Sequence, residues 1–485
     1  MSPDRQVVVV GAGPAGLVAA IALARLEVHV LVVERRAETS SLARALVVST
    51  RSMEIFRGWD LEDEIRAGAA EVEPLGWAAL TLASAEGTEV PLGYPTAAQA
   101  AKVSPTRPAW VPQDHLEPLL LGLLRSLPSA EVRFGCELVD AKASHDGVQV
   151  SLRMGNSNFE ELHAEFVIGA DGAHSIVRNL ASIRMEGPEN LGEFHRVEFR
   201  APLSRIVGER RYGLYLVSNP SVAGVIARRG AGDRWSLSRE WTGHGQLRIV
   251  DADETQLGEL IAAASGVHVL CLQIEAVNSF RIAAQLAGHY RQGRLFLVGD
   301  AAHRMTPRGG TGMNTAIQDA YDIAWKLGWV LRHWADEEIL DSYEGERQPV
   351  GRHNVERTAQ PDGARQDVQD ALPWDLSGRL KHHWIQDGAK ALSTLDLPGD
   401  GFALLTGPDM PQWSTTTLAP GWWAPLVIHR LDAGTAAALG IEASGARLLR
   451  PDGKDAGRWA FFTSPLAPRF DAPCVTSNAE PPLLG

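Results

Sequence analysis

The chain of 485 residues is poor in cysteine. It contains only Cys136, Cys271 and Cys474, and no two of them form a CxxC pair. Such widely separated cysteines argue against a disulfide framework, a zinc ribbon and a dithiol redox centre. We therefore expect reduced thiols in a cytoplasmic protein.

The sequence also lacks an apolar stretch long enough to span a bilayer. Its apolar beginning is broken by glycines and a proline and is followed by no signal-peptide cleavage pattern. The formal net charge is −13, whereas nonspecific nucleic-acid binding requires a basic surface that displaces counterions from phosphates. Neither a membrane nor a nucleic acid is therefore predicted as a partner.

What the chain does contain is typical of a large globular protein. Hydrophobic residues make up 45% and charged residues 22% of the sequence, and the length predicts two or three domains. Residues 187–285 form short alternating segments, which predict an antiparallel sheet. The pattern of a parallel sheet resumes at residues 293–303, before a strong helix at about 314–334, so we expect a discontinuous first domain. The charged stretch 336–370 is predicted to be helical and well solvated.

The motif GAGPAG at residues 11–16 lies between a buried β-type run and an apolar helical stretch. Gly11 permits the tight turn, Gly13 lets the backbone approach a pyrophosphate, and Gly16 lets helix and strand pack closely. The helix N-terminus favours phosphate. Glu34 ends the next strand, VHVLVVE, where its carboxylate can accept hydrogen bonds from both hydroxyls of an adenosine ribose. The motif therefore predicts a nucleotide such as FAD or NAD.

A second GxGxxG is absent, which argues against an enzyme of the pyridine-nucleotide disulfide reductase type. The stretch GDAAHRMTPRGGTGMN, residues 299–314, instead combines Asp300 and His303 with a glycine-rich loop before a helix. No nucleophile and no HxH or HExxH pattern accompanies this pair, so we predict neither a catalytic triad nor a metal site.

The glycines of this stretch leave room for a ring against bare backbone, and the backbone N–H groups that open the helix can point at the ring. These residues are Gly309, Gly310, Gly312, Met313 and Asn314. Such donors would stabilise negative charge on a bound group.

Together with GAGPAG, the stretches VIGADGAHSIVR (167–178) and GRLFLVGDAAHRMTPRGGTGMNTAIQDAYDIAWKL (293–327) resemble the three fingerprints of the class A flavoprotein aromatic hydroxylases, which have the p-hydroxybenzoate hydroxylase fold. Residues 34–57 also resemble that family. The segments TLDLPGDGFALLTG and ARLLRPDGKDAGRW resemble the third domain of its longer members, which include phenol hydroxylase and the hydroxylases that tailor aromatic polyketides.

The resemblance implies an α/β protein with three domains. A discontinuous, Rossmann-like FAD-binding domain would comprise residues 1–75, 100–186 and 286–385. Residues 76–99 and 187–285 would form an antiparallel-sheet substrate-binding domain. Residues 390–485 would form a thioredoxin-like C-terminal domain without CxxC.

The resemblance also implies which residues bind FAD. The residues so assigned are Gly11, Ala12, Gly13, Pro14, Ala15, Gly16, Glu34, Arg35, Arg44, Gln113, Asp171, Asp300, Pro307, Gly310, Gly312, Met313 and Asn314. Arg44 and Gln113 match positions at the ribityl–pyrophosphate region, and Asp300 matches one that accepts from a ribityl hydroxyl. Asp171 and Arg178 are associated in the family with the FAD fold and with NAD(P)H use, in a role more structural than chemical.

No catalytic side chain is assigned, because the flavin carries the chemistry. Pro307 and Arg308 are predicted to line the active site. Arg308 departs from the family pattern, which has an apolar or small residue there, so that it either meets an anionic substrate or points to solvent.

The activity implied is that of a monooxygenase with non-covalently bound FAD, which uses NADH or NADPH and O2. Oxygen would pass from the flavin C4a-hydroperoxide to a phenolic or polycyclic aromatic substrate, of the polyketide type. The alternatives are Baeyer–Villiger insertion, oxidative inactivation of an aromatic antibiotic, and a flavin-binding scaffold without turnover. A monomer or a homodimer is expected.

Overall fold

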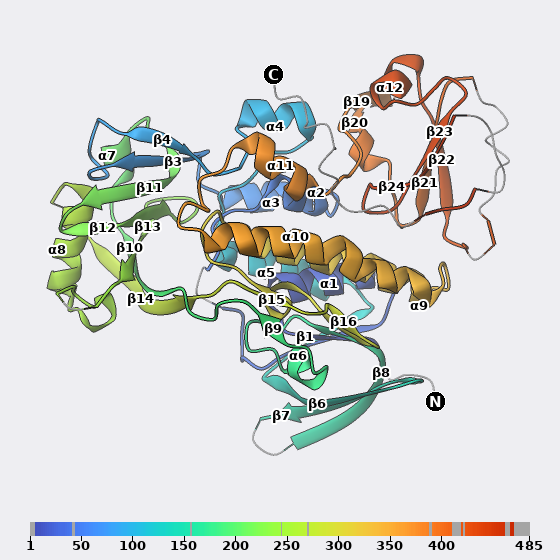
Figure 1. The fold of residues 1–485 in the computed structure, drawn as a ribbon, viewed down its shortest axis with the longest axis horizontal. Coiled ribbons are helices and arrows are strands. Elements are labelled where there is room, and N and C mark those ends of the chain that lie inside the picture. The colour runs from blue at the N-terminus through green and yellow to red at the C-terminus, as the bar shows by residue number, and fades with distance from the viewer. Residues whose placement is uncertain are drawn as a thin grey trace.

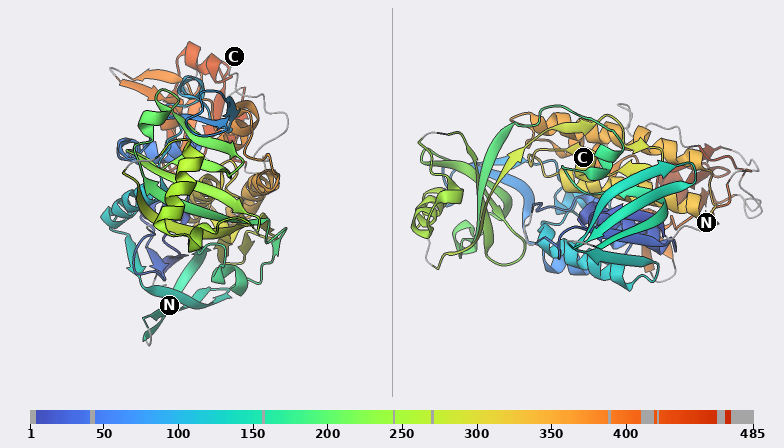
Figure 2. Two further views of the ribbon diagram at one scale, coloured as in Figure 1. Left: turned by 90° about the vertical axis from the view of Figure 1, so that its left-hand side faces the viewer. Right: turned by 90° about the horizontal axis from the view of Figure 1, so that it is seen from below.

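A computed structural model describes residues 5–40, 44–155, 158–243, 245–268, 271–387, 390–409, 419–420, 422–460 and 466–469, and the statements below concern these residues. The molecule is elongated, with a sheet-rich unit at one end, a central α/β unit, and a smaller C-terminal unit at the other end (Figures 1 and 2). Within the described ranges, no helix combines the length and the apolar character needed to cross a membrane.

The central unit is built on an eight-stranded sheet with the path β16-β17-β8-β1-β2-β5, to which β7 and then β6 are added beside β8. Its strands are β1 (Arg5–Val10), β2 (Val30–Glu34), β5 (Ala130–Phe134), β6 (Cys136–Ser144), β7 (Gly147–Met154), β8 (Asn158–Gly169), β16 (Arg291–Gln292) and β17 (Leu295–Leu297). β17, β8, β1, β2 and β5 run parallel. Val7, Val8 and Val9 are completely buried, as expected of a parallel strand that is covered on both faces.

Helices surround this sheet, and the chain returns to it after the sheet-rich unit, so the central unit is discontinuous (Figure 1). Its helices are α1 (Pro14–Arg25), α2 (Thr50–Arg57), α3 (Glu62–Ala67), α4 (Ala97–Val103), α5 (Gln113–Ser126), α6 (Ile176–Leu180), α9 (Gly312–Leu331), α10 (Ser342–Ala359) and α11 (Val368–Leu376). A small sheet of β18 (His303–Arg304), β15 (Gln285–Ala287) and β9 (Met185–Glu186) adjoins α10.

The sheet-rich unit has seven strands in the order β14-β10-β13-β12-β11-β3-β4. Its elements are β3 (Glu73–Ala79), β4 (Thr88–Pro91), β10 (Gly192–Arg200), α7 (Ser204–Val207), β11 (Tyr212–Asn219), β12 (Val222–Arg228), β13 (Arg234–Trp241), α8 (Glu254–Ser265) and β14 (Gln273–Ile282). The strands of this sheet that come from residues 187–285 pair antiparallel, as predicted, whereas β11 runs parallel to β3, which comes from outside that range. β3 comes from a distant part of the chain, so no hairpin sets its direction.

The charged region 336–370 is helical in α10 and at the start of α11, as predicted. The prediction of good solvation is wrong for Glu346 and Arg347, which are 3% and 2% exposed. Inside the protein, Glu346 pairs with Lys326 of α9 and Arg347 pairs with Asp319 of α9.

The C-terminal unit contains a four-stranded sheet in the order β22-β21-β23-β24 and a hairpin of two strands. Its elements are β19 (Trp384–Asp387), β20 (Lys390–Ser393), β21 (Phe402–Thr406), β22 (Leu426–Arg430), α12 (Ala433–Ala438), β23 (Ala446–Leu449) and β24 (Asp455–Trp459). β21 and β22 are parallel, whereas β23 and β24 are antiparallel to their neighbours. This arrangement is consistent with the expected thioredoxin-like domain, although part of residues 390–485 lies outside the described ranges. The domain boundaries stay a prediction.

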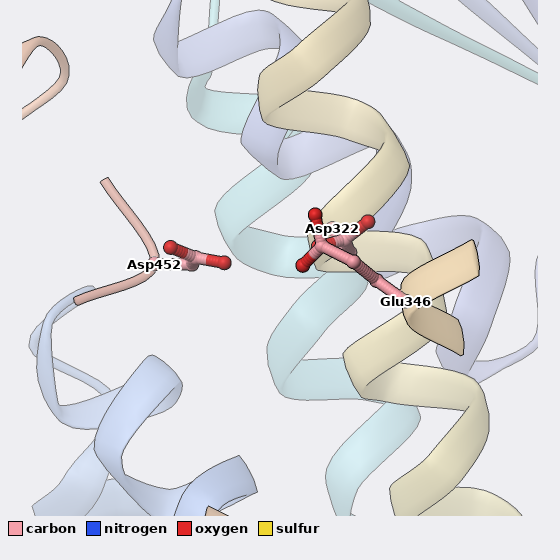
Figure 3. Close-up of side chains that lie close together, drawn as sticks. All are labelled: Asp322, Glu346 and Asp452. Atoms are coloured by element: carbon pink, nitrogen blue, oxygen red, sulfur yellow. The ribbon is translucent and has the colours of Figure 1, made fainter. Parts of the chain in front are cut away.

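A buried group of charges joins the C-terminal unit to α9 and α10. Carboxylate oxygens of Asp322 (α9), Glu346 (α10) and Asp452 (β23–β24 turn) lie within 4.8 Å of one another (Figure 3). Three cations lie among them: Lys326 Nζ is 2.7 Å from Asp322, Arg450 Nη2 is 2.7 Å from Glu346, and Lys454 Nζ is 2.9 Å from Glu346. Three carboxylates and three cations balance, so this charge cluster is neutral without a metal ion.

The charge cluster predicts a pH-dependent stability for the C-terminal contact. Burial alone would raise the pKa of Asp452. Arg450 and Lys454 outweigh burial and lower this pKa from the usual 3.8 to about 2. Because the folded pKa is the lower one, the stabilisation is complete above pH 3.8 and is lost as the pH falls toward 2. We expect Asp452→Asn to lower the free energy of unfolding at pH 7 by about 3 kcal/mol. The difference from the parent should shrink as the pH falls toward 2.

Urea titrations over this pH range measure the effect. The matched control is Asp251→Asn, whose carboxylate is exposed and pairs with Arg248 at 2.8 Å, and which should change the free energy by less than about 0.5 kcal/mol. A difference between Asp452→Asn and the parent that is independent of pH would contradict the prediction.

Candidate functional site

The first part of the site is the turn between β1 and α1. Gly11 has φ +108°, and a Cβ atom there would overlap the carbonyl oxygen of Ala170, while a Cβ at Gly16 would overlap the carbonyl oxygen of Gly11. Gly13 is different, because a Cβ there would meet no atom within 4 Å. Protein packing therefore requires the first and third glycines, whereas the space beside the second is open to a ligand. Pro14 begins the helix, where its missing N–H costs nothing.

Glu34 lies at the end of β2 and is 6% exposed. Its carboxylate accepts hydrogen bonds from the backbone N–H of Ala12 at 2.9 Å and from the backbone N–H and Nε of Arg36 at 2.9 and 3.0 Å. Burial alone raises the pKa of Glu34, but these donors outweigh burial and lower it below its usual 4.5. Glu34 is therefore an ionised acceptor beside the glycine-rich turn, while its neighbour Arg35 is exposed.

The segment with Arg44 is attached to α5. The backbone N–H of Gln113 donates to the carbonyl of Ala45 at 3.0 Å, and its side-chain Nε2 donates to Glu117 Oε1 at 2.6 Å. Arg44 itself is exposed. Glu117, which the sequence analysis did not single out, is 1% exposed, and burial raises its pKa.

Asp171 and Arg178 of the Asp-Gly motif make hydrogen bonds to neighbouring backbone groups. Asp171 Oδ2 accepts the backbone N–H groups of Ile176 at 2.7 Å and Val177 at 3.1 Å, which fixes the start of α6. Arg178 donates to the carbonyl oxygens of Ala301 and Ala173, both at 3.0 Å. The motif therefore connects the turn after β8 to the turn that contains Asp300.

Asp300 and His303 do not form a pair. Asp300 is exposed, although surrounding protein atoms still raise its pKa by desolvation. His303 is completely buried, and its Nε2 lies 2.6 Å from Oδ2 of Asp319 on α9. The other oxygen of Asp319 accepts from Arg347 Nε at 2.8 Å. His303 thus has a structural role beneath the site, and the side chain of Asp300 remains accessible.

The loop before α9 exposes backbone donors. α9 begins at Gly312, and no described backbone hydrogen bond is donated by the N–H groups of Gly312, Met313 or Asn314. The side chain of Asn314 is already engaged: its Oδ1 accepts from the N–H of Ser49 at 2.8 Å, and its Nδ2 donates to the carbonyl of Val47 at 3.1 Å. Only the backbone of Asn314 is therefore available to a ligand.

Arg308 follows Pro307, whose ring is exposed. The guanidinium of Arg308 donates from Nη1 to the carbonyl oxygens of Ala359 at 3.2 Å and Gln360 at 3.3 Å. A cation at these carbonyls complements the C-terminal end of α10. The Arg308 side chain is therefore held at α10 and does not project freely into solvent.

These features fit FAD. The open space at Gly13, the helix that begins at Pro14 and the ionised Glu34 suit the ADP half. The free N–H groups at the start of α9 suit a ring that gains negative charge.

The fingerprints match a family described as "FAD binding domain" over residues 4–358. Tetracenomycin B2 monooxygenase-dioxygenase of Streptomyces olivaceus is 30% identical, with 92% of this chain and 94% of that protein covered. Aklavinone 12-hydroxylase DnrF of Streptomyces peucetius is 32% identical, with 86% and 94% covered. The crystal structure of aklavinone-11 hydroxylase with FAD and aklavinone superimposes with a TM-score of 0.84 at 29% identity, with 96% and 97% covered.

The chain therefore belongs to the family of FAD-binding-domain proteins. It is a class A FAD-dependent monooxygenase, and its cofactor is FAD. The predicted family, enzyme class and cofactor are confirmed, whereas the individual site residues stay predictions.

The contrast between Gly13 and Gly16 gives a test of where the FAD phosphates lie. We expect Gly13→Ala to fold as stably as the parent, since the added methyl group meets no protein atom and φ there is −79°. It should weaken FAD binding by at least about tenfold, because the methyl group keeps the pyrophosphate from the backbone. Gly16→Ala should lose stability, because its methyl group overlaps the carbonyl of Gly11.

FAD titration by fluorescence quenching and thermal unfolding of the apoprotein separate the two effects. Unchanged FAD affinity in a folded Gly13→Ala protein would show that the phosphates lie elsewhere.

Proposed function

We propose that this enzyme hydroxylates a phenolic or polycyclic aromatic substrate of the polyketide type, with FAD, NAD(P)H and O2. The single observation that carries the proposal is the loop at residues 309–314, whose helix N-terminus has three unpaired N–H groups in the same chain as an FAD-binding turn. The relatives named for tetracenomycin and aklavinone support the substrate class. Bound FAD supplies the redox and oxygen-transfer chemistry.

The protein's own contribution is to bind and orient. Glu34 accepts from the adenosine ribose, and Gly13 and the α1 N-terminus bind the pyrophosphate. Arg44 contacts the ribityl–pyrophosphate region, where Gln113 positions its segment. Asp300, exposed beside the turn, accepts from the ribityl chain.

The remaining contacts concern the ring. The N–H groups of Gly312, Met313 and Asn314 stabilise negative charge on the reduced ring. Pro307 borders the reaction site, and Arg308 holds that border to α10. We further propose a cytoplasmic monomer or homodimer, which the unpaired thiols of Cys136 and Cys271 support.

A basic pocket offers a place for the nicotinamide cofactor. It is lined by Ala173, His174, Arg178, Asn179, Ile183, Arg184, Met185, Glu189, Gln285 and Arg304. Three arginines and one histidine face a single carboxylate there, a balance that suits the phosphates of NAD(P)H. Ala173, His174 and Arg178, which follow Asp171 and Gly172, line the pocket, and Arg178 also contacts the turn of Asp300.

The proposed reaction is tested with purified holoenzyme, NADH or NADPH, oxygen and a panel of phenols and polycyclic aromatic polyketides. We expect NAD(P)H oxidation that depends on oxygen and is stimulated by an aromatic compound, and a product that gains one oxygen atom as a hydroxyl group. A lactone product would favour Baeyer–Villiger insertion, and loss of antibacterial action on conversion would favour antibiotic inactivation. Holoenzyme without stimulated turnover on any member of the panel would favour the scaffold.

The basic pocket leads to a separate prediction about NAD(P)H binding. Arg184→Ala should raise the KM for NAD(P)H by about fivefold, since one charge-assisted hydrogen bond contributes on the order of 1 kcal/mol at an exposed site. Its FAD affinity should equal that of the parent. Arg107→Ala, at an exposed arginine outside the pocket, is the control. An unchanged KM in Arg184→Ala would exclude this pocket as the phosphate site.

A further inference from the structure

The loop before α9 is held from behind by a side chain of another unit. Tyr94 follows β4, and its Oη donates to the carbonyl oxygen of Gly309 at 3.0 Å. The ring is 6% exposed, and burial raises the pKa of Tyr94 above its usual 10.0. Tyr94 is therefore a neutral phenol at pH 7 and can donate this hydrogen bond.

Arg357 of α10 contacts the same loop. Its Nη2 donates to Thr311 Oγ1 at 3.2 Å, and its Nη1 donates to the carbonyl of Gly363 at 2.6 Å. Burial lowers the pKa of Arg357, with a partial compensation from Tyr94. The guanidinium thus bridges the loop and the turn that follows α10.

These two side chains account for glycine at positions 309 and 310. Both residues have positive φ, +83° and +64°. A Cβ at Gly309 would lie 2.7 Å from Arg357 Nη1, and a Cβ at Gly310 would lie 3.1 Å from Tyr94 Oη and 2.8 Å from Val47 Cγ1. The backbone conformation and the neighbouring protein atoms therefore both favour glycine at these two positions.

The loop borders a pocket with both polar and apolar lining. Its lining includes Tyr94, Gly309, Thr311, His353, Arg357 and Asp375. Burial lowers the pKa of His353 to about 4, so this ring, stacked on Trp374 at 3.9 Å, is neutral at pH 7. The loop is therefore contacted here both by apolar side chains such as Val47 and by the hydrogen bonds of Tyr94 and Arg357.

Tyr94 also connects the loop to the seven-stranded sheet. With Val47, Val90, Leu92 and Trp110 it forms a buried apolar group, against which Leu214 and Leu216 of β11 pack. The ring of Tyr94 therefore lies between this apolar group and the carbonyl of Gly309.

We propose that Tyr94 and Arg357 are positioning residues. They hold the backbone donors of residues 309–314 in the position from which these donors contact the flavin, and Tyr94 links that position to the seven-stranded sheet. The inference rests on the proposed role of this loop as the flavin cradle. Neither residue is catalytic, because both touch the loop and not the reacting atoms.

The test uses holoenzyme in which Tyr94 is replaced by phenylalanine, which removes one hydroxyl and keeps the ring. We expect the Kd for FAD to rise about fivefold, as for the loss of one hydrogen bond. The visible absorption and circular dichroism of bound FAD and its midpoint potential should shift. Where an aromatic substrate stimulates turnover, a larger share of the electrons from NAD(P)H should reduce O2 to hydrogen peroxide without forming product, because the backbone donors no longer face the ring correctly.

The matched control is Tyr212→Phe, which removes a hydroxyl that donates to Glu89 at 2.7 Å in the same sheet. It should leave all these readouts at parent values. Arg357→Gln should shift the flavin spectrum in the same direction as Tyr94→Phe, and Arg357→Lys should restore part of it. The double variant Tyr94→Phe/Arg357→Gln should show less than the sum of the two single effects, because both act through one loop.

Two results would overturn the inference. One is a Tyr94→Phe enzyme that loses thermal stability while its FAD spectrum, midpoint potential and Kd equal those of the parent. The other is an equal shift of these readouts in Tyr212→Phe. If the parent oxidises no aromatic compound, the proposed function is wrong, but the spectrum, the potential and the Kd of bound FAD still decide this inference.

Discussion

The buried carboxylate of Asp319 is the interaction on which the arrangement of the site depends. One of its oxygens lies 2.6 Å from His303 and the other 2.8 Å from Arg347, so a single side chain of α9 fastens both the turn that carries Asp300 and the helix α10. Burial alone would raise the pKa of Asp319, but Arg347 and His303 outweigh it and keep the group ionised. An apolar residue there would leave a buried arginine without its counter-charge, which is among the costlier defects in a protein interior.

α9 carries this arrangement from the flavin loop to the far end of the molecule. Its first turn provides the unpaired N–H groups, its middle carries Asp319, and farther along Asp322 and Lys326 enter the charge cluster with Glu346, Arg450 and Asp452. Near its end, the ring of Trp329 packs on Phe402 of β21 at 4.7 Å. The C-terminal unit is thus attached to the helix whose first turn we propose as the flavin contact, which gives a domain without CxxC a structural use.

The sequence analysis correctly predicted those features of the fold that depend on residues close together in the chain. The turn at Gly11–Gly16, the start of α9 and the order of the units follow from glycine spacing and hydrophobic period, which are local properties. It missed Glu117, Asp319 and Tyr94, because each acquires its role from a partner far away in the chain. It also misjudged the solvation of Glu346 and Arg347, since charge predicts exposure only where no buried counter-charge exists. α8 went unpredicted because its segment was assigned as a whole to the sheet.

Gly309 and Gly310 show why a motif and the reason given for it must be kept apart. The sequence analysis explained glycine at these positions by a flavin ring that packs directly against the backbone. In the fold, both residues have positive φ and a Cβ there would approach Arg357, Val47 or Tyr94, so a side chain at either position would be disfavoured even in a chain that bound no flavin. The glycines alone therefore indicate the geometry of a loop. The evidence for a cofactor comes from groups that the protein leaves without a partner of its own: three N–H groups at the start of α9 and the open space at Gly13. Backbone donors that a helix N-terminus leaves to water or to a ligand form a site suited to negative charge, whatever the sequence around them.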